Sequence, residues 1–165
     1  MSLESGKYEI KNAETFINRH PIEDRSLNPK RIVSLPEDVQ ALYPWTVEKV
    51  DDKYLLKAGG APTGEHEGHV YALLMYQEKT EHWVLDPAES PNSNCKFIIR
   101  TKDRKKGWVA QEGSTHEDLK KVNMHHSSVE RQIIDGFKVK CEPLSGSDGN
   151  YPANEIFQFS KATAD

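Results

Sequence analysis

Cysteine is scarce in this sequence: only Cys95 and Cys141 occur among 165 residues. Two thiols are too few for the disulfide framework of a small secreted scaffold. The first residues, MSLESGKYEI, contain neither a basic segment nor an apolar one and are not typical of a secretory signal. No Asn-x-Ser/Thr glycosylation motif is present either. We therefore expect a cytoplasmic chain whose two cysteines stay reduced.

Long apolar runs and an excess of one charge are also missing. No stretch approaches the roughly 20 apolar residues that a membrane helix needs. The 22 Lys and Arg against 26 Asp and Glu leave a net charge of −4, which provides no basic surface for nucleic acid. We therefore expect neither a membrane nor a nucleic acid as partner. A chain of this length is one ordinary domain, so residues 1–165 are expected to fold as a single unit.

Motifs for catalysis, cofactor binding and metal binding are absent as well. The sequence has no P-loop, no G-x-G-x-x-G and no G-x-S-x-G, and neither cysteine lies in an activating motif. His66 and His69 lie in EHEGH, which lacks the spacing of a helical zinc motif and is interpreted as a polar loop or hairpin. His125-His126 has no cysteine at a zinc-like spacing. The sequence predicts a protein that is not an enzyme and needs no metal or cofactor.

A threefold repeat is what the sequence does contain. One pattern, in which basic residues enclose an aromatic and an aliphatic residue, occurs as KYEIK at 7–11, KYLLK at 53–57 and KFIIR at 96–100. The alternation within these segments is typical of a strand with one buried face. We expect the three segments to occupy equivalent strands, with Tyr8, Tyr54 and Phe97 at matching positions.

A second series closes each unit. It consists of WTVEK at 45–49, WVLDP at 83–87 and IFQFS at 156–160. Trp45, Trp83 and Phe157 are expected at matching positions of the core. Three units of this length are too few for a propeller and too long for most solenoid repeats.

Further strand candidates fill the units. They lie at 15–19, 30–35, 69–77, 107–111, 129–134 and 137–142. Tight hairpin turns are predicted at Asp51-Asp52 and Asp135-Gly136. Three units of about four strands predict an all-β protein with the β-trefoil architecture, a closed barrel with a hairpin cap. The match is imperfect, because no second strand is evident around 60–65 and because 114–126 is interpreted as an insertion with at most one short helix.

A cationic run lies between two of these strands. It consists of Lys102, Arg104, Lys105 and Lys106. Such a run is usually a charged turn that protects an exposed strand edge. A site for sulfated glycans is the alternative, although the acidic remainder of the surface weakens that attraction.

The most informative irregular stretch is IEDRSLNPKRIVSL at 22–35. It joins two strand candidates over about ten residues, more than a hairpin needs. Ser26, Asn28 and Pro29 are turn formers, and the residue before a proline is restricted to extended geometry. An extended, proline-stiffened loop on a rigid barrel has the shape of a protease substrate. Such a loop loses little ordering entropy when it enters a protease cleft, which favours tight binding.

Basic side chains in this stretch suit the S1 pocket of a trypsin-type protease, the pocket that selects the residue before the cleaved bond. Arg25, Lys30 or Arg31 would meet the carboxylate at the bottom of that pocket. The alternative is an ordinary connection built from common turn residues.

Several long segments resemble one known family. MSLESGKYEI, EDRSLNPKRIV, GGAPTGEHEGHVYALLMYQE and KGWVAQ are similar to segments of the fungal β-trefoil serine protease inhibitors of mushrooms, the cospin and Lentinus inhibitor family. The resemblance covers residues 1–111 well and the C-terminal third weakly, and 114–126 departs from the family pattern. It implies a cytosolic, disulfide-free β-trefoil that inhibits trypsin-like serine proteases through the loop between its second and third strands.

The resemblance also implies a role for Asn28. In the family an Asn of this loop acts as P1, the residue whose side chain enters S1, and its counterpart here is Asn28, surrounded by Ser26, Leu27 and Pro29. A neutral amide only donates hydrogen bonds to the S1 carboxylate, whereas Arg25 would pair with it electrostatically. We place Asn28 first on the resemblance and keep Arg25 as the alternative. A proline after P1 resists cleavage, which suits an inhibitor.

The sequence therefore predicts a monomeric β-trefoil that inhibits trypsin-like serine proteases by inserting residues 24–31 into the active-site cleft. The expected protease-binding residues are Asn28, Arg25, Ser26, Leu27, Pro29 and Lys30. The alternative is a carbohydrate-binding β-trefoil lectin. A lectin repeats its polar and aromatic binding residues in several units, but the Gln-x-Trp pattern of ricin-type lectins is absent and only the core strands repeat here. The asymmetry of the loops favours the inhibitor.

Overall fold

The computed structural model describes residues 3–20, 25–36, 44–75, 77–88, 95–111, 138–147 and 150–162. In these residues, twelve strands form one continuous sheet, four in each unit. The first unit contains β1 (Gly6–Asn12), β2 (Thr15–Arg19), β3 (Lys30–Pro36) and β4 (Trp45–Val50). The second contains β5 (Lys53–Ala58), β6 (Ala61–His66), β7 (His69–Ala72) and β8 (Val84–Pro87). The third contains β9 (Lys96–Arg100), β10 (Gly107–Val109), β11 (Lys140–Glu142) and β12 (Phe157–Lys161).

Two short 3-10 helices lie in the described parts of the connections. The first, η1 (Gln77–Lys79), precedes β8, and the second, η2 (Ala153–Glu155), precedes β12. No helix in the described part of the chain has the length and apolar character needed to cross a membrane.

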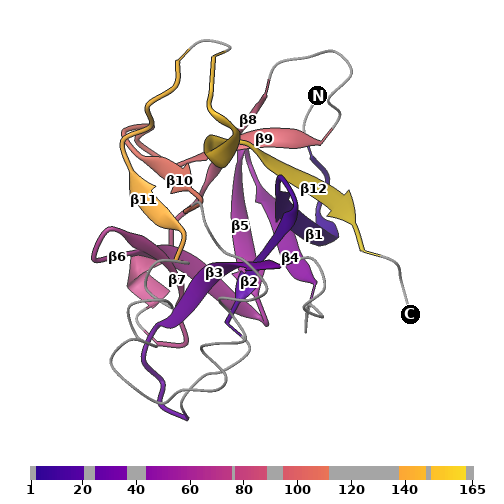
Figure 1. The fold of residues 1–165 in the computed structure, drawn as a ribbon. Coiled ribbons are helices and arrows are strands. Elements are labelled where there is room, and N and C mark those ends of the chain that lie inside the picture. The colour runs from indigo at the N-terminus through magenta and orange to yellow at the C-terminus, as the bar shows by residue number, and fades with distance from the viewer. Residues whose placement is uncertain are drawn as a thin grey trace.

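Six strands close into a barrel. β1 pairs with β4 and β12, β4 with β5, β9 with β8 and β12, and the backbones of Tyr54 and Trp83 join β5 to the start of β8 with hydrogen bonds of 2.9 and 2.8 Å. The hairpins β2–β3, β6–β7 and β10–β11 form the cap, where β7 pairs with both β3 and β11. Figure 1 shows the hairpins β2–β3 and β6–β7 together at the lower end of the molecule. A closed six-stranded barrel with three capping hairpins is the predicted β-trefoil.

The repeated segments occupy equivalent strands, as predicted. Tyr8 of β1 pairs with Trp45 of β4, and Phe97 of β9 pairs with Phe157 of β12. In the second unit Tyr54 is opposite Trp83. In each unit, therefore, two aromatic residues at equivalent positions face each other across the first and last strands. Alternation explains why these segments are strands, since every second residue of β5 is buried and the residues between them are half-buried.

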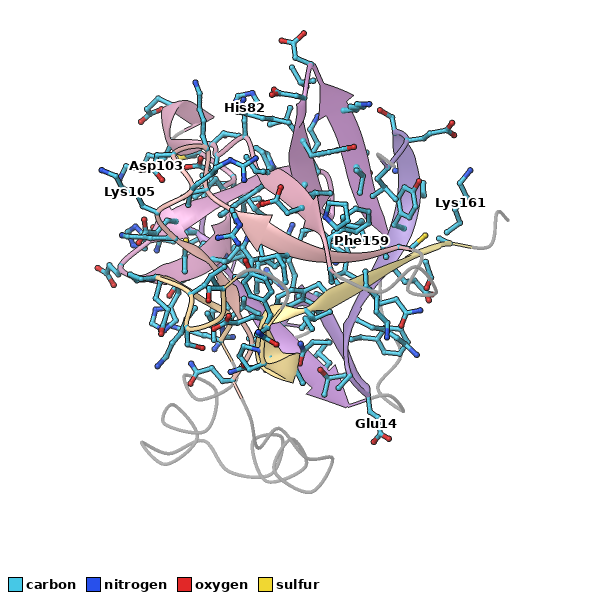
Figure 2. The ribbon with its side chains drawn as sticks, turned by 90° about the horizontal axis from the view of Figure 1, so that it is seen from above. Glu14, His82, Asp103, Lys105, Phe159 and Lys161 are labelled. Atoms are coloured by element: carbon cyan, nitrogen blue, oxygen red, sulfur yellow. The ribbon has the colours of Figure 1, made fainter. Side chains whose placement is uncertain are left out.

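In the core, Trp108 packs against the aromatic residue at the start of the last strand of each unit. The Trp108 ring of β10 lies 5.7 Å from Trp45, 5.5 Å from Trp83 and 5.7 Å from Phe157, measured between ring centroids, and all four side chains are buried. Figure 2 shows another core ring, Phe159, among the barrel strands, whereas Glu14, Lys105 and Lys161 lie at the periphery. The barrel and its cap therefore share one aromatic core, which gives the loops of the cap a rigid base.

Two strand predictions need correction. The predicted strand 69–77 ends at Ala72, because β3 offers backbone partners only to Tyr71 and Ala72 and the chain then leaves the sheet, exposing Met75. The strand that was not evident around 60–65 is β6, which lacks an alternating apolar pattern and is held by its register with β7.

The remaining strand predictions differ from the structure only at their ends. Candidates 15–19 and 30–35 correspond to β2 and β3, and 107–111 and 137–142 to the shorter β10 and β11. The hairpin turn at Asp51-Asp52 is present, with Asp51 at a φ of 58°. The predicted strand 129–134, the turn Asp135-Gly136 and the insertion 114–126 lie outside the described residues.

Candidate functional site

The loop between β2 and β3 stands on a well-paired base. The two strands pair over five positions, from Thr15 with Pro36 to Arg19 with Ile32. Beyond the last pair, the His20 N–H donates to the Arg31 carbonyl at 3.2 Å. β3 also pairs through its first two residues with β7 on its other side. The chain therefore leaves and re-enters the cap at fixed points, as a presented loop requires.

The described part of this loop, residues 25–29, is called the loop segment here, and it extends below the cap in Figure 1. Arg25, Leu27 and Asn28 are exposed in it, whereas Ser26 and Pro29 are half-buried. Among the large apolar side chains of the described residues, Leu27 is the most exposed, at 59%. Residue 24, the first of the predicted inserting residues 24–31, lies outside the described residues.

Lys30 is the buried member of the predicted binding set. It is the first residue of β3, is only 5% exposed and pairs with Ala72 of β7. Sequence reasoning included it because its basic side chain would suit the carboxylate of a trypsin-type S1 pocket. Pairing of β3 with β7 covers it, so Lys30 anchors the loop and the described surface is formed by 25–29.

A local hydrogen bond shapes the loop segment. The Asn28 N–H donates to the Ser26 hydroxyl oxygen at 3.2 Å, which closes a turn around Leu27. Pro29 follows with its backbone φ held near the value that its ring imposes. Both features reduce the number of conformations that the segment has to lose when it binds a partner.

A groove of about 490 Å³ lies beside the loop segment. Its lining residues are Asn28, Pro29, His66, Tyr71, Leu73 and Lys79. The rings of His66 and Tyr71 meet edge to face at 5.3 Å, and the Lys138 ammonium donates to the Tyr71 hydroxyl at 2.7 Å. Sequence reasoning missed the side of the groove that His66 and Tyr71 form. β6 and β7 lie next to the loop only because β7 pairs with β3 in the cap.

Two side chains of the cationic run form ion pairs with carboxylates. Arg104 lies 2.9 Å from Asp86, and Lys106 lies 2.8 Å from Glu65. The backbone N–H of Lys102 donates to the Glu81 carboxylate at 2.7 Å. The hydrogen bond that the Lys106 ammonium donates to the Glu65 carboxylate raises the pKa of Lys106. The neighbouring cavity of about 560 Å³ is lined by carboxylates as well as lysines. Such a balanced surface does not favour a sulfated glycan.

Histidines do not assemble a metal site in the described part of the chain, where no group of three or more His, Cys, Asp or Glu side chains has a suitable arrangement. EHEGH is the predicted hairpin, with Glu67 and Gly68 at φ values of 52° and 78° in the turn between β6 and β7. The pair His125-His126 lies outside the described residues.

The three hairpin loops of the cap differ strongly in length. The chain from 20 to 29 joins β2 to β3, a two-residue turn joins β6 to β7, and the chain from 110 to 139 joins β10 to β11. The threefold symmetry of the strands is therefore not continued in the loops. Unequal connections suit one asymmetric binding loop better than a lectin with one site in each unit.

Comparisons with known proteins agree with this arrangement. The family model described as peptidase inhibitor I66 matches residues 1–161. A curated serine protease inhibitor of Lentinula edodes is 36% identical over 160 residues, which cover 97% of this chain and 99% of that protein. The solved structure of a proteinase inhibitor from Coprinopsis cinerea matches with a TM-score of 0.73 and 29% identity, over 98% of this chain and all of that one.

A lectin shares the architecture at much lower identity. The ricin B-like lectin of Macrolepiota procera, solved with lactose, matches with a TM-score of 0.61 and 13% identity, over 98% of this chain and 99% of the lectin. At that identity the likeness shows a common β-trefoil fold and nothing about binding.

Proposed function

The chain belongs to the peptidase inhibitor I66 family, and on that premise we propose that it inhibits trypsin-like serine proteases by inserting the loop between β2 and β3 into their active-site cleft. The family and the Lentinula edodes relative are inhibitors of proteases and not enzymes. The observation that carries the mechanism is the loop segment 25–29, which is exposed between two anchored strands.

Pre-organisation is the physical reason for choosing this loop. The paired bases of β2 and β3, the hydrogen bond from Asn28 to Ser26 and the ring of Pro29 all restrict the segment before binding. A protease that binds it pays little additional ordering entropy, so the contacts made in the cleft contribute almost fully to affinity.

Asn28 is the proposed P1 residue, and Arg25 is the alternative. Both are exposed. The amide group of Asn28 would donate hydrogen bonds to the carboxylate of a trypsin-type S1 pocket, and the guanidinium of Arg25 would form a bidentate ion pair with it. With Asn28 at P1, the residue after the cleaved bond is Pro29, whose ring nitrogen carries no hydrogen, and slow cleavage of that bond would prolong inhibition.

We further propose that the inhibitor acts as a monomer in the cytoplasm. Support comes from Cys95 and Cys141, which are not bonded to each other, since unbridged thiols fit a reducing compartment. One asymmetric loop also suffices for one protease, without a second copy of the chain.

Titration of trypsin tests the proposal directly. Increasing amounts of the purified protein are added to trypsin of known active-site concentration, and the residual hydrolysis of a small substrate is measured. We expect activity to fall to a low plateau near equimolar inhibitor or at a modest excess of it. Full activity at a large excess of folded inhibitor would overturn the trypsin-like specificity.

A further inference from the structure

Leu27 is an apolar side chain presented at the centre of the loop segment. Its exposure of 59% exceeds that of Met75, at 47%, and Val50, at 38%, the other two large apolar side chains that are exposed in the described part of the chain. Single exposed apolar residues are common on protein surfaces. This one, however, lies on a turn that its two neighbours close with a hydrogen bond.

The residues around Leu27 differ in exposure. Ser26 and Pro29 are half-buried, whereas Asn28 is exposed and lines, with Pro29, the groove formed with His66 and Tyr71. The loop segment therefore presents an isobutyl group to a partner, next to the exposed amide of Asn28.

We infer that the loop has a second reactive register, in which Leu27 is the P1 residue for serine proteases with an apolar S1 pocket. A hydrophobic S1 slot buries a branched aliphatic or aromatic side chain, whereas the carboxylate of a trypsin-type pocket has no partner in leucine. The inference rests on the proposed insertion of this loop into protease clefts. It adds a second class of protease, which the same loop would inhibit with P1 one residue earlier, at Leu27 instead of Asn28.

The peptide bond of this register has the chemistry that a reversible reaction needs. The protease serine oxygen attacks the Leu27 carbonyl carbon, the bond to the Asn28 nitrogen breaks, and the protease histidine transfers the serine proton to that nitrogen. The products are an ester on Leu27 and a free amine on Asn28. In the other register the leaving nitrogen belongs to the ring of Pro29, which carries no hydrogen.

The fold holds the amine beside the ester. The Ser26 hydroxyl, on the acyl side of this bond, accepts the hydrogen bond from the Asn28 nitrogen on the leaving side, at 3.2 Å. The pairing of Arg19 with Ile32 keeps both ends of the loop attached to the cap. The amine can therefore attack the ester again, which re-forms the peptide bond and releases the serine oxygen with its proton. High effective concentration favours this reversal over hydrolysis by water.

Inhibition of chymotrypsin tests the second register, with trypsin measured in parallel. We expect wild type to inhibit chymotrypsin, Leu27→Ala to weaken that inhibition at least about tenfold, and Leu27→Phe to retain or tighten it. Leu27→Ala should weaken trypsin inhibition by a smaller factor, because in the trypsin register Leu27 precedes P1 and its side chain does not enter S1. Unchanged thermal unfolding serves as the folding control, because Leu27 is exposed.

The cleavage position provides a second, independent measurement. Long incubation with a catalytic amount of chymotrypsin, followed by mass spectrometry, should identify cleavage between Leu27 and Asn28. Cleavage only elsewhere, no inhibition of chymotrypsin by wild type, or an equal effect of Leu27→Ala on both proteases would overturn the second register while leaving the trypsin register standing. If wild type inhibits both enzymes and no substitution at positions 25, 27 or 28 alters either inhibition, the loop itself is the wrong site.

Discussion

The Ser26 hydroxyl oxygen and the Asn28 backbone nitrogen lie 3.2 Å apart and share a hydrogen bond across Leu27. This bond spans two positions of a loop that the cap anchors at both ends. It converts an exposed connection into a defined turn, so its removal should affect inhibition more than it affects folding.

Ser26→Ala tests that relationship. Loss of one exposed hydrogen bond of this kind costs about 0.5–1.5 kcal/mol, so inhibition should weaken by a factor of roughly 2 to 10. The variant should also be cleaved faster by the target protease, because the two sides of the reactive bond are less well held. Time courses of inhibition and of cleavage measure both effects. Ser26→Thr, which keeps the oxygen, is the matched control, and equally durable inhibition by the alanine variant would contradict the role of the turn.

Asn28→Ala tests the P1 assignment toward trypsin. Interface hot spots contribute about 2 kcal/mol or more, so the inhibition constant should rise by a factor of roughly 30. Stability should change by no more than about 0.5 kcal/mol, because the side chain is exposed. Asn28→Lys supplies the cation that the trypsin pocket prefers and should retain or tighten inhibition.

Arg25→Ala is the paired control for that assignment. A larger loss of trypsin inhibition in this variant than in Asn28→Ala would transfer P1 to Arg25. If both variants remain folded and inhibit trypsin as wild type does, this loop is not the site for trypsin.

Glu155 is expected to stabilise the connection between β11 and β12. Its buried carboxylate accepts hydrogen bonds from the Ser145 N–H at 2.9 Å, the Ser145 hydroxyl at 2.8 Å and the Gly146 N–H at 3.1 Å. Glu155→Gln replaces one acceptor oxygen with a donor and should lower the free energy of unfolding by about 1–3 kcal/mol. Urea denaturation measures this, with the half-exposed Glu142→Gln as control. Equal effects of the two substitutions would show that the three bonds contribute nothing.

Alkaline stability should depend on Cys141. Burial raises the pKa of this thiol from 9.0 to about 12, so the folded protein keeps a proton that the unfolded chain releases above pH 9. Stability is therefore lost as pH rises from 9 toward 12. Cys141→Ala should show a shallower decline in that range when unfolding free energies of the two proteins are compared across pH. Parallel declines would contradict this contribution.

The two cysteines should also react differently with thiol reagents. Cys95 is exposed, whereas Cys141 is buried with a raised pKa, and the thiolate is the reactive form. In the native protein near neutral pH, a disulfide reagent should modify Cys95 and leave Cys141 intact. Two thiols should be found after denaturation without reductant. Finding none would indicate an oxidising compartment and contradict the cytoplasmic proposal.

Much of the fold follows from local patterns. Tyr8, Tyr54 and Phe97 stand at the same place in three alternating segments, and this spacing alone predicts three equivalent strands. By contrast, β6 has no such pattern, since its segment APTGEH contains a proline and a glycine. It is a strand because β7 supplies its hydrogen-bonding partners, and partner strands override weak local propensity.

The loop could likewise be located from the sequence, but its surface could not. Turn residues around Asn28 and the family resemblance mark a loop that presents residues to a partner. Which of those residues are presented depends on contacts between segments far apart in the chain. β7 covers Lys30, and His66 and Tyr71 line the groove beside Asn28. Leu27 is the most exposed large apolar side chain of the described residues. Periodicity and turn chemistry are local, so the sequence by itself determined the alternating strands and the position of the loop. Burial depends on what lies opposite, so only the tertiary structure decided which side chains of that loop are available to a protease.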